Sequence, residues 1–225
     1  AQDVRDFTIT ASPDYRTASV VVGGTTIRAY YRPGGPGPAM LSAARNALSK
    51  MAALVGAYPY ATFKVVQSAG GFGMESPELI WVPTGVASSN LRYLVTHETA
   101  HQWFYGIVGS NQPYEPYTDE AAADFLARYV LSLRRSSGCA TARLDLSIYR
   151  YSSACYYEVI YIQGGNFLDD IRRTIGATAF WNALRGYVAA NRFGIVTTKM
   201  LLDALDNATP QNLVPRYHTR FPRIY

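Results

Sequence analysis

The segment Val95–Trp103, with the sequence VTHETAHQW, decides how the rest of the chain is interpreted. His97 and His101 are four positions apart, so on a helix their side chains share one face and both imidazoles can reach one metal ion. Glu98 projects beside them, where its carboxylate can take a proton from a water activated by that metal. Two surface histidines on an amphipathic helix are the alternative. The apolar residues of the segment favour a buried helix, in which polar side chains need partners.

A third metal ligand is expected from Glu120, which lies 19 positions after His101, near the start of the next predicted helix. A loop and the first turn of an antiparallel helix would bring its carboxylate back over the same ion. Two histidines and one glutamate leave a fourth position open for water, which is the arrangement of catalytic zinc. Asp124, on the same helix face as Glu120, either accepts the free ring N–H of a zinc-bound histidine or is an ordinary helix aspartate. The sequence therefore predicts one Zn²⁺.

Around this segment, strands are predicted first and helices later. Alternating and apolar runs predict strands over 4–10, 18–22, 25–30, 61–66 and 79–82, with a hairpin turn at 23–24. Helical spacing predicts helices over about 39–55, 91–105, 119–133, 153–174, 177–190 and 197–207, with caps at 88–90 and at 118 or 119. This order favours an α+β fold over an alternating parallel sheet.

The composition is that of a folded domain. The chain has 225 residues, of which 48% are hydrophobic and 16% are charged, so it has enough apolar surface for a core and too little charge for disorder. No apolar run reaches the roughly 18–20 residues of a membrane helix, and no membrane span is expected. The net charge of +5 comes from scattered arginines rather than a basic stripe, so no nucleic-acid partner is expected either.

The two cysteines leave two possibilities open. Cys139 and Cys155 lie 16 positions apart in a loop-rich stretch and form either a disulfide or two buried free thiols. A disulfide would imply an oxidising compartment, and together with the scarcity of lysine this favours an extracytoplasmic protein over a cytoplasmic one. The chain opens without Met and without a signal-type segment, so we expect it to be excised from a longer protein.

The predicted zinc site follows the gluzincin pattern, and three other segments resemble the M1 aminopeptidases, the family of aminopeptidase N. GFGMESP (71–77) is similar to the family's Gly-x-Met-Glu-Asn element, YTDEA (117–121) to Trp-Leu-Asn-Glu-Gly, and YIQGG (161–165) to Tyr-x-Lys-Gly-Ala. The opening VRDF (4–7) resembles the end of the family's N-terminal β domain.

This resemblance covers nearly the whole chain and implies a thermolysin-like catalytic domain over residues 1–225. Residues 1–12 would end the preceding β domain. A sheet-rich lobe would follow over about 13–88, and a helical lobe over about 89–225.

The resemblance assigns substrate binding to the first of these segments. Glu75 would bind the free α-amine of a peptide, because an acylated N-terminus would leave its carboxylate unpaired. The backbone of Gly71, Gly73 and Met74 would pair with the extended substrate like an added strand, and glycine permits that close approach.

The resemblance also assigns the chemical step. Glu98 would be the general base and then the acid for the leaving amine, and Tyr161 would donate a hydrogen bond to the oxyanion. Asp119, beside Glu120, would contact the zinc ligands. Tyr161 competes for its role with other nearby tyrosines and is preferred because Gly164 and Gly165 follow it at the family spacing. The neighbouring tyrosines are Tyr149, Tyr151, Tyr156 and Tyr157.

Taken together, these assignments predict a zinc aminopeptidase that acts on peptides with a free N-terminus, with further β and C-terminal domains in the full protein. The sequence departs from the family at Ser76, where Asn is usual, and at Gln163, where Lys is usual, and the stretch between Glu120 and Tyr161 is short. Two alternatives remain. The spacing of Glu120 and Asp124 also fits a thermolysin-like endopeptidase. A family member kept for binding or scaffolding is less compatible with the intact ligand set.

Overall fold

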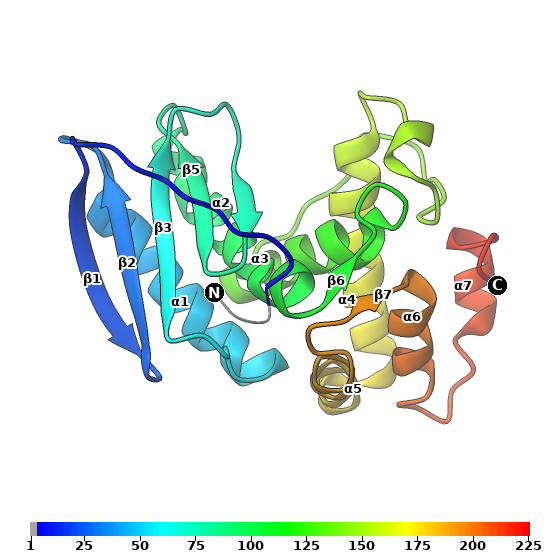
Figure 1. Cartoon of the computed structure of the whole chain (residues 1–225). Coiled ribbons are helices and arrows are strands. Elements are labelled where there is room, and N and C mark those ends of the chain that lie inside the picture. The colour runs from blue at the N-terminus through cyan, green and yellow to red at the C-terminus, as the bar shows by residue number, and fades with distance from the viewer. Residues whose placement is uncertain (1–3) are drawn as a thin grey trace. The chain divides into compact units, whose positions relative to one another are not determined.

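The computed structural model describes residues 4–225, so the first three residues of the 1–12 segment lie outside the described part of the chain. The chain separates into two compact units, Ala1–Ile107 and Val108–Tyr225. The first unit contains the main sheet with two helices, and the second is mostly helical (Figure 1).

The first unit is built on a five-stranded mixed sheet. The strands are β1 (Arg16–Val22), β2 (Thr25–Tyr31), β3 (Thr62–Ser68), β4 (Met74–Ser76) and β5 (Leu79–Pro83), in the spatial order β1-β2-β3-β5-β4. Strands β1 and β2 form an antiparallel hairpin through Gly23 and Gly24, whose φ angles of 55° and 88° require glycine-like freedom. Strands β2, β3 and β5 are parallel, and β4 is antiparallel to β5 at one edge. A mixed sheet followed by helices confirms the predicted α+β class.

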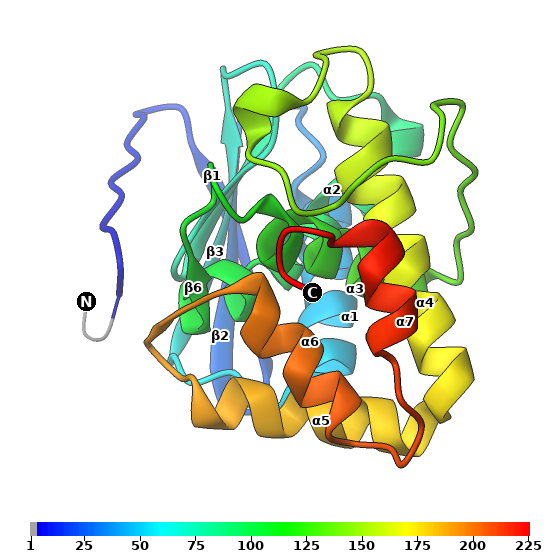
Figure 2. The ribbon, with the colours of Figure 1, turned by 90° about the vertical axis from the view of Figure 1, so that its right-hand side faces the viewer.

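Two helices, α1 (Gly37–Val55) and α2 (Ser88–Ala100), cover one face of this sheet (Figure 2). The apolar stripe of α1 is buried at helical spacing and packs over the strands. Its fully buried members include Met40, Ala44, Leu48 and Met51. Helix α2 begins at Ser88, so the predicted capping residues form its first turn and none of them caps it by a side-chain hydrogen bond.

The predicted strand over residues 4–10 is wrong, because residues 4–14 form neither helix nor strand. The alternation of apolar and polar residues in this segment is nevertheless matched by an alternation of outward-facing and inward-facing side chains. Phe7 and Ile9 point outward and are 71% and 78% exposed, whereas Asp6 and Thr8 turn inward and contact the Ser76 hydroxyl of β4. Side-chain hydrogen bonds therefore attach this segment in place of a backbone ladder.

The second unit is mostly helical. Its helices are α3 (Ala122–Leu131), α4 (Gly164–Ile175), α5 (Ala177–Ala190), α6 (Thr198–Asp206) and α7 (Val214–Arg220), together with a 3-10 turn over Ile148–Arg150 and the short parallel strands β6 (Gly109–Ser110) and β7 (Ile195–Val196). An aromatic cluster of Phe125, Phe180 and Trp181 fills its core between α3 and α5. Helix α7 was not predicted, because Pro215 interrupts the sequence pattern there. The structure places this proline in the first turn of the helix, where proline is tolerated.

Three π-helical segments interrupt the predicted helices. They are η1 (Gln102–Ile107), η2 (Tyr117–Ala121) and η4 (Glu158–Gln163), of which η1 is kinked at Phe104, whose φ of −102° and ψ of 52° are not helical. The two helices predicted over 91–105 and 119–133 therefore each contain a π segment, and the helix predicted from residue 153 becomes regular only at Gly164. Single π turns within helices are frequent at functional sites, and all three segments lie next to or contain predicted site residues.

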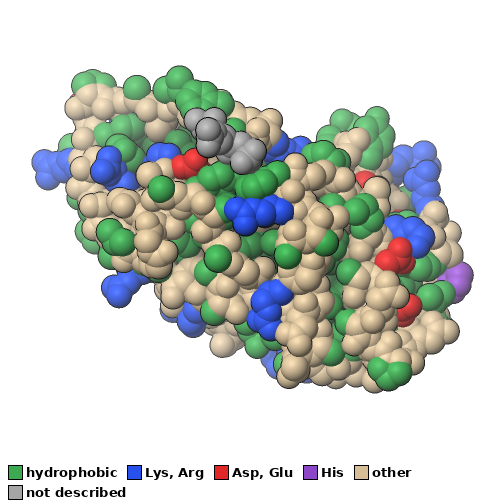
Figure 3. Space-filling view, turned by 60° about the horizontal axis from the view of Figure 1, so that its bottom comes forward, with side chains coloured by type: hydrophobic (Ala, Val, Ile, Leu, Met, Phe, Trp, Pro, Cys, Tyr) green, Lys and Arg blue, Asp and Glu red, His purple; other side chains and the backbone are tan. Residues whose placement is uncertain are grey.

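The surface and the loops carry two further features. On the face drawn in Figure 3, lysine and arginine side chains form separate groups among neutral ones rather than one stripe. Among residues 4–225, no helix combines the length and the apolar character that crossing a bilayer would require. Cys139 and Cys155 are bridged by a disulfide with a Cα–Cα distance of 6.0 Å, which decides between the two possibilities that the sequence left open.

Candidate metal centre and its surroundings

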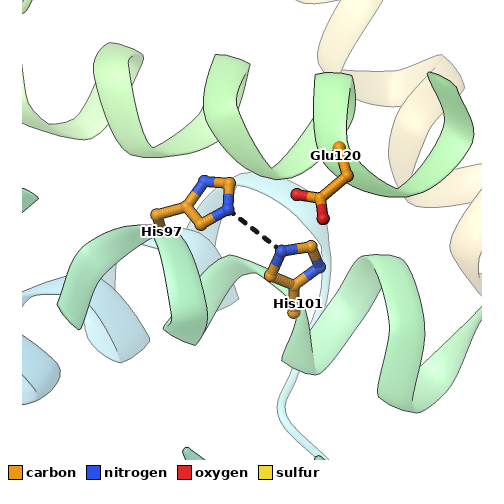
Figure 4. Close-up of side chains that lie close together, drawn as sticks. All are labelled: His97, His101 and Glu120. Atoms are coloured by element: carbon orange, nitrogen blue, oxygen red, sulfur yellow. Dashed lines mark hydrogen bonds between the residues drawn. The ribbon is translucent and has the colours of Figure 1, made fainter. Parts of the chain in front are cut away.

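The two histidines of the central segment lie at the end of α2 and face each other. Their Nε2 atoms are 3.1 Å apart and their rings are nearly perpendicular, as Figure 4 shows. Both side chains are buried, with His97 5% and His101 1% exposed. Tyr93, one turn before His97, stacks on the His97 ring at a centroid distance of 5.9 Å. The i, i+4 spacing therefore places both imidazoles on one helix face, as predicted.

A break in the helix after His101 brings a backbone carbonyl to one of its ring nitrogens. Phe104 has non-helical dihedral angles within η1, and its carbonyl oxygen lies 3.4 Å from Nδ1 of His101. A carbonyl only accepts hydrogen bonds, so this contact assigns the proton to Nδ1 and leaves the Nε2 lone pair directed at His97. This is the tautomer that a metal-binding histidine needs.

The donor set fits a zinc ion. Zinc–nitrogen bonds of 2.0–2.1 Å at a tetrahedral angle separate two ligating nitrogens by about 3.3 Å. The observed separation of the two Nε2 atoms, 3.1 Å, is close to that value. Neutral imidazoles are common zinc ligands, and their burial limits competing water.

Glu98 lies against the turn that precedes β4. A Cβ atom at Gly73 would overlap with the Glu98 carboxylate and would stand 2.8 Å from a methyl carbon of Leu94. Glycine at this position therefore leaves the space in which the carboxylate lies. The contact joins the predicted base to the segment with Met74 and Glu75, so these predicted residues come together within the first unit.

Strand β4, which carries Glu75, is held by a residue that the sequence analysis missed. Gln102 follows His101 and is fully buried. Its amide nitrogen donates to the Ser76 carbonyl at 2.8 Å, and its amide oxygen accepts from the Glu78 N–H at 2.8 Å. The sequence could have pointed to Gln102, because a polar side chain in a predicted buried helix must find hydrogen-bond partners.

Asp6 holds the same strand from the N-terminal side. Its carboxylate accepts hydrogen bonds from the Ser76 hydroxyl and the Tyr105 hydroxyl, and the Arg5 guanidinium lies 4.3 Å above the Tyr105 ring. Burial and the hydrogen bond to Asp6 raise the pKa of Tyr105, so this phenol stays protonated as a donor. Ser76, the departure from the family's Asn, thus has a defined structural role.

In the second unit, η2 and η4 bring Glu120 and Tyr161 together. The Tyr161 hydroxyl donates to the Glu120 carboxylate, and burial together with that negative charge raises the pKa of Tyr161. Asp119, next to Glu120, is 2% exposed and accepts from the side-chain amide of Gln112. Glu120, also drawn in Figure 4, lies in η2, which continues directly into α3, the helix that carries Asp124.

Asp124 is fully buried and binds Arg128, one turn further on α3. The Arg128 Nε donates to Asp124 Oδ2 at 2.6 Å. This partner was missed by the sequence analysis, although a basic residue at i+4 from an aspartate on a buried helix was a usable signal. The proposed bond from a zinc-bound histidine to Asp124 remains a prediction.

Gln163 and Glu158 fasten the disulfide loop to η4. The Gln163 amide nitrogen donates to the carbonyls of Cys139 and Ala140 at 3.1 and 3.0 Å, and its oxygen accepts from Arg220 at 3.0 Å. The Glu158 carboxylate accepts from the Cys139 N–H at 2.8 Å. Gln163, the second departure from the family, therefore serves loop attachment.

Comparison with known proteins gives a consistent picture of the fold. No family model matches the chain. An M1 zinc metallopeptidase from Deinococcus radiodurans is similar with a TM-score of 0.69 and 23% identity, over 86% of this chain and 48% of that one. A mutant M1 zinc metallopeptidase from the same organism, bound to a Tyr-Ser-Ala substrate, has a TM-score of 0.67 and 22% identity over the same shares.

Legionella pneumophila aminopeptidase A, in complex with aspartic acid, has a TM-score of 0.79 and 15% identity, over 91% of this chain and 28% of that one. This chain has the fold of the M1 zinc metallopeptidases. It spans about half the length of the Deinococcus structures.

Proposed function

We propose that this chain is the catalytic domain of a zinc aminopeptidase. The observation that carries the proposal is the buried pair of Nε2 atoms of His97 and His101, 3.1 Å apart, with the Glu98 carboxylate on the same helix. The similarity in fold to M1 zinc metallopeptidases supports the same reading.

His97, His101 and Glu120 would hold one zinc ion. The ligand pattern of the sequence supports Glu120 as the third member, and its position in η2 beside Tyr161 fits a residue inside a catalytic centre. When bound, the ion would supply Lewis acidity, which polarises the substrate carbonyl and lowers the pKa of a water molecule.

Glu98 would move the proton. Its carboxylate would accept a proton from the attacking water and then release it to the nitrogen of the leaving amine. The space left by Gly73 supports this role, because the carboxylate can lie beside the turn that leads into β4 without displacing a side chain.

Glu75 would select substrates with a free N-terminus. It lies on β4, the edge strand of the sheet, where the backbone of residues 71–74 could pair with an extended peptide. The ammonium of the substrate would pair with the Glu75 carboxylate, and a blocked N-terminus would leave that charge without a partner.

Tyr161 would stabilise the oxyanion. Its phenol is protonated at neutral pH, and its single proton, once turned away from Glu120, can be donated to the charge that develops on the carbonyl oxygen. Asp119 and Asp124 would support the ligands from their buried positions on the same helical segment.

We also propose a cellular location for the enzyme and further domains beside this one. The Cys139–Cys155 disulfide supports an oxidising, extracytoplasmic location. The greater length of the similar structures supports further domains around this one in the full protein.

Hydrolysis of amino-acid amides with free and acetylated N-termini tests the proposal on zinc-loaded protein. We expect cleavage of the free amines alone, with loss of this selectivity in Glu75→Ala and full retention in the control Glu78→Gln, whose carboxylate pairs with Lys64 instead. Cleavage of blocked peptides by the unaltered protein would favour a thermolysin-like endopeptidase. Zinc binding without any cleavage would favour a binding or scaffolding role.

A further inference from the structure

Arg128 is a buried cation to which the proposed mechanism gives no role. It lies on α3 and is only 5% exposed. Its Nε donates to Asp124 at 2.6 Å and its Nη1 donates to the Asn166 side-chain oxygen at 2.7 Å. Its Nη2 donates to two backbone carbonyls of η4, those of Ile162 at 3.2 Å and Tyr161 at 3.4 Å. Burying a guanidinium is costly unless its donors are satisfied, and here each nitrogen has an acceptor.

The carbonyls that Arg128 binds lie where η4 changes into α4. At this change from π to α geometry, the Tyr161 carbonyl accepts from the Gly164 N–H, and Arg128 adds a side-chain donor to the backbone of the same turn. Gly165 leaves room for this contact. A Cβ atom at Gly165 would overlap with Nη2 of Arg128 and would stand 2.9 Å from the Asp124 carboxylate. The glycine and the buried arginine therefore form one fitted arrangement.

The two ends of Tyr161 are thus held by one continuous helical stretch. Its hydroxyl donates to Glu120 of η2, and its carbonyl accepts from Arg128 of α3, which follows η2 directly. Because η2 and α3 are contiguous, the spacing between these two contacts is set by helix geometry. A shift of η4 along α3 would break the contact at one end or the other.

We propose that Arg128, oriented by Asp124, is a positioning residue that fixes the backbone of η4 and thereby the place of the Tyr161 hydroxyl. The inference rests on the proposed function, which assigns Tyr161 to the oxyanion. Arg128 itself touches no reacting atom. Lysine could replace its charge opposite Asp124 but not its planar fork, which reaches three partners in different directions.

The first test is a double-mutant cycle with zinc-loaded protein and a free-amine amide substrate. We expect Arg128→Lys to lower kcat by roughly 10- to 100-fold with little change in KM, since a misplacement of about 1 Å has effects of that order. In the Tyr161→Phe background, the same substitution should lower kcat by less than about threefold, because the group it positions is already gone. Equal losses in both backgrounds would overturn the proposal.

Arg172→Lys is the matched control. Arg172 is an arginine of the same unit whose guanidinium pairs with Asp169 on its own helix and lies over the Tyr129 ring, rather than binding the carbonyls of η4. It should leave kcat, KM and the zinc content unchanged. A loss of kcat in the control equal to that of Arg128→Lys would contradict a specific role for Arg128.

The second test does not depend on activity. Hydrogen–deuterium exchange of peptides covering residues 158–166 should be faster in Arg128→Lys than in Arg172→Lys, with unchanged exchange in α2. Unchanged exchange over 158–166 would overturn the proposal. Asn166→Ala removes one of the acceptors of Arg128 and should accelerate exchange in the same peptides to a smaller extent. This variant replaces Arg128→Lys in the test if Arg128→Lys does not fold. If Tyr161→Phe leaves kcat unchanged, the assignment of Tyr161 to the oxyanion fails, whereas the exchange result still decides whether Arg128 holds η4.

Discussion

Removal of the Cys139–Cys155 disulfide should destabilise the second unit while leaving its folded structure in place. The two cysteines are 16 residues apart in the sequence. For a loop of this length, the chain-entropy relation gives a stabilisation of about 3 kcal/mol at 25 °C, because the bridge restricts the unfolded chain. In a protein of this size, a loss of 1 kcal/mol of unfolding free energy lowers Tm by about 2–4 °C, so Tm should fall by about 6–12 °C.

The folded loop keeps other attachments when the bridge is absent. Glu158 accepts from the N–H groups of Gly138 and Cys139, and Gln163 donates to the carbonyls of Cys139 and Ala140. These bonds do not involve the sulfur atoms. The effect should therefore arise in the unfolded chain, and amide exchange of the loop in the folded protein should change little.

Urea denaturation of the Cys139→Ser/Cys155→Ser variant, with and without reductant, measures this effect. The variant should lose about 3 kcal/mol of unfolding free energy, and reductant should destabilise only the unaltered protein. An unchanged free energy of unfolding would refute the entropic reasoning. Strongly accelerated exchange throughout the loop would refute the claim that Glu158 and Gln163 hold it independently.

Three other changes have defined outcomes. Tyr161→Phe should lower kcat by roughly 10²–10³-fold without loss of zinc, and an unchanged kcat in steady-state kinetics would remove Tyr161 from the mechanism. Asp6→Asn should lower the unfolding free energy by about 1–2 kcal/mol in urea denaturation, because it weakens the bonds to Ser76 and Tyr105. Hydrogen bonds from the Cys139 N–H, the Ser137 hydroxyl and the Gly138 N–H lower the pKa of Glu158. Its contribution to stability is therefore present above the ordinary glutamate pKa and is lost as pH falls through the lowered pKa. An NMR titration of Glu158 that gives an ordinary pKa would contradict this.

Much of the fold follows from local patterns in the sequence. The β1–β2 hairpin is predictable because Gly23 and Gly24 interrupt two strand-like runs, and α1 because its apolar residues recur at helical spacing. The approach of His97 to His101 is equally local, because a helix alone brings residues four apart together.

Features that depend on distant partners could not be predicted. Residues 4–10 alternate like a strand, but Asp6 binds side chains 70 and 99 positions away instead of a backbone ladder. No local pattern in the sequence predicted the three π segments. The buried roles of Gln102 and Arg128 depend on acceptors in other elements, which only the folded chain brings to them.

Zinc content is the most direct measurement of whether His97 and His101 form a metal site with Glu98 beside it as the base. Purified unaltered protein, Glu98→Gln and His101→Ala are compared after dialysis against zinc-containing buffer and removal of free metal. We predict one zinc per chain in the unaltered protein and in Glu98→Gln, no zinc in His101→Ala, and peptidase activity in the unaltered protein alone. Zinc retained at full stoichiometry by His101→Ala, or absent from the unaltered protein, would contradict the proposed centre.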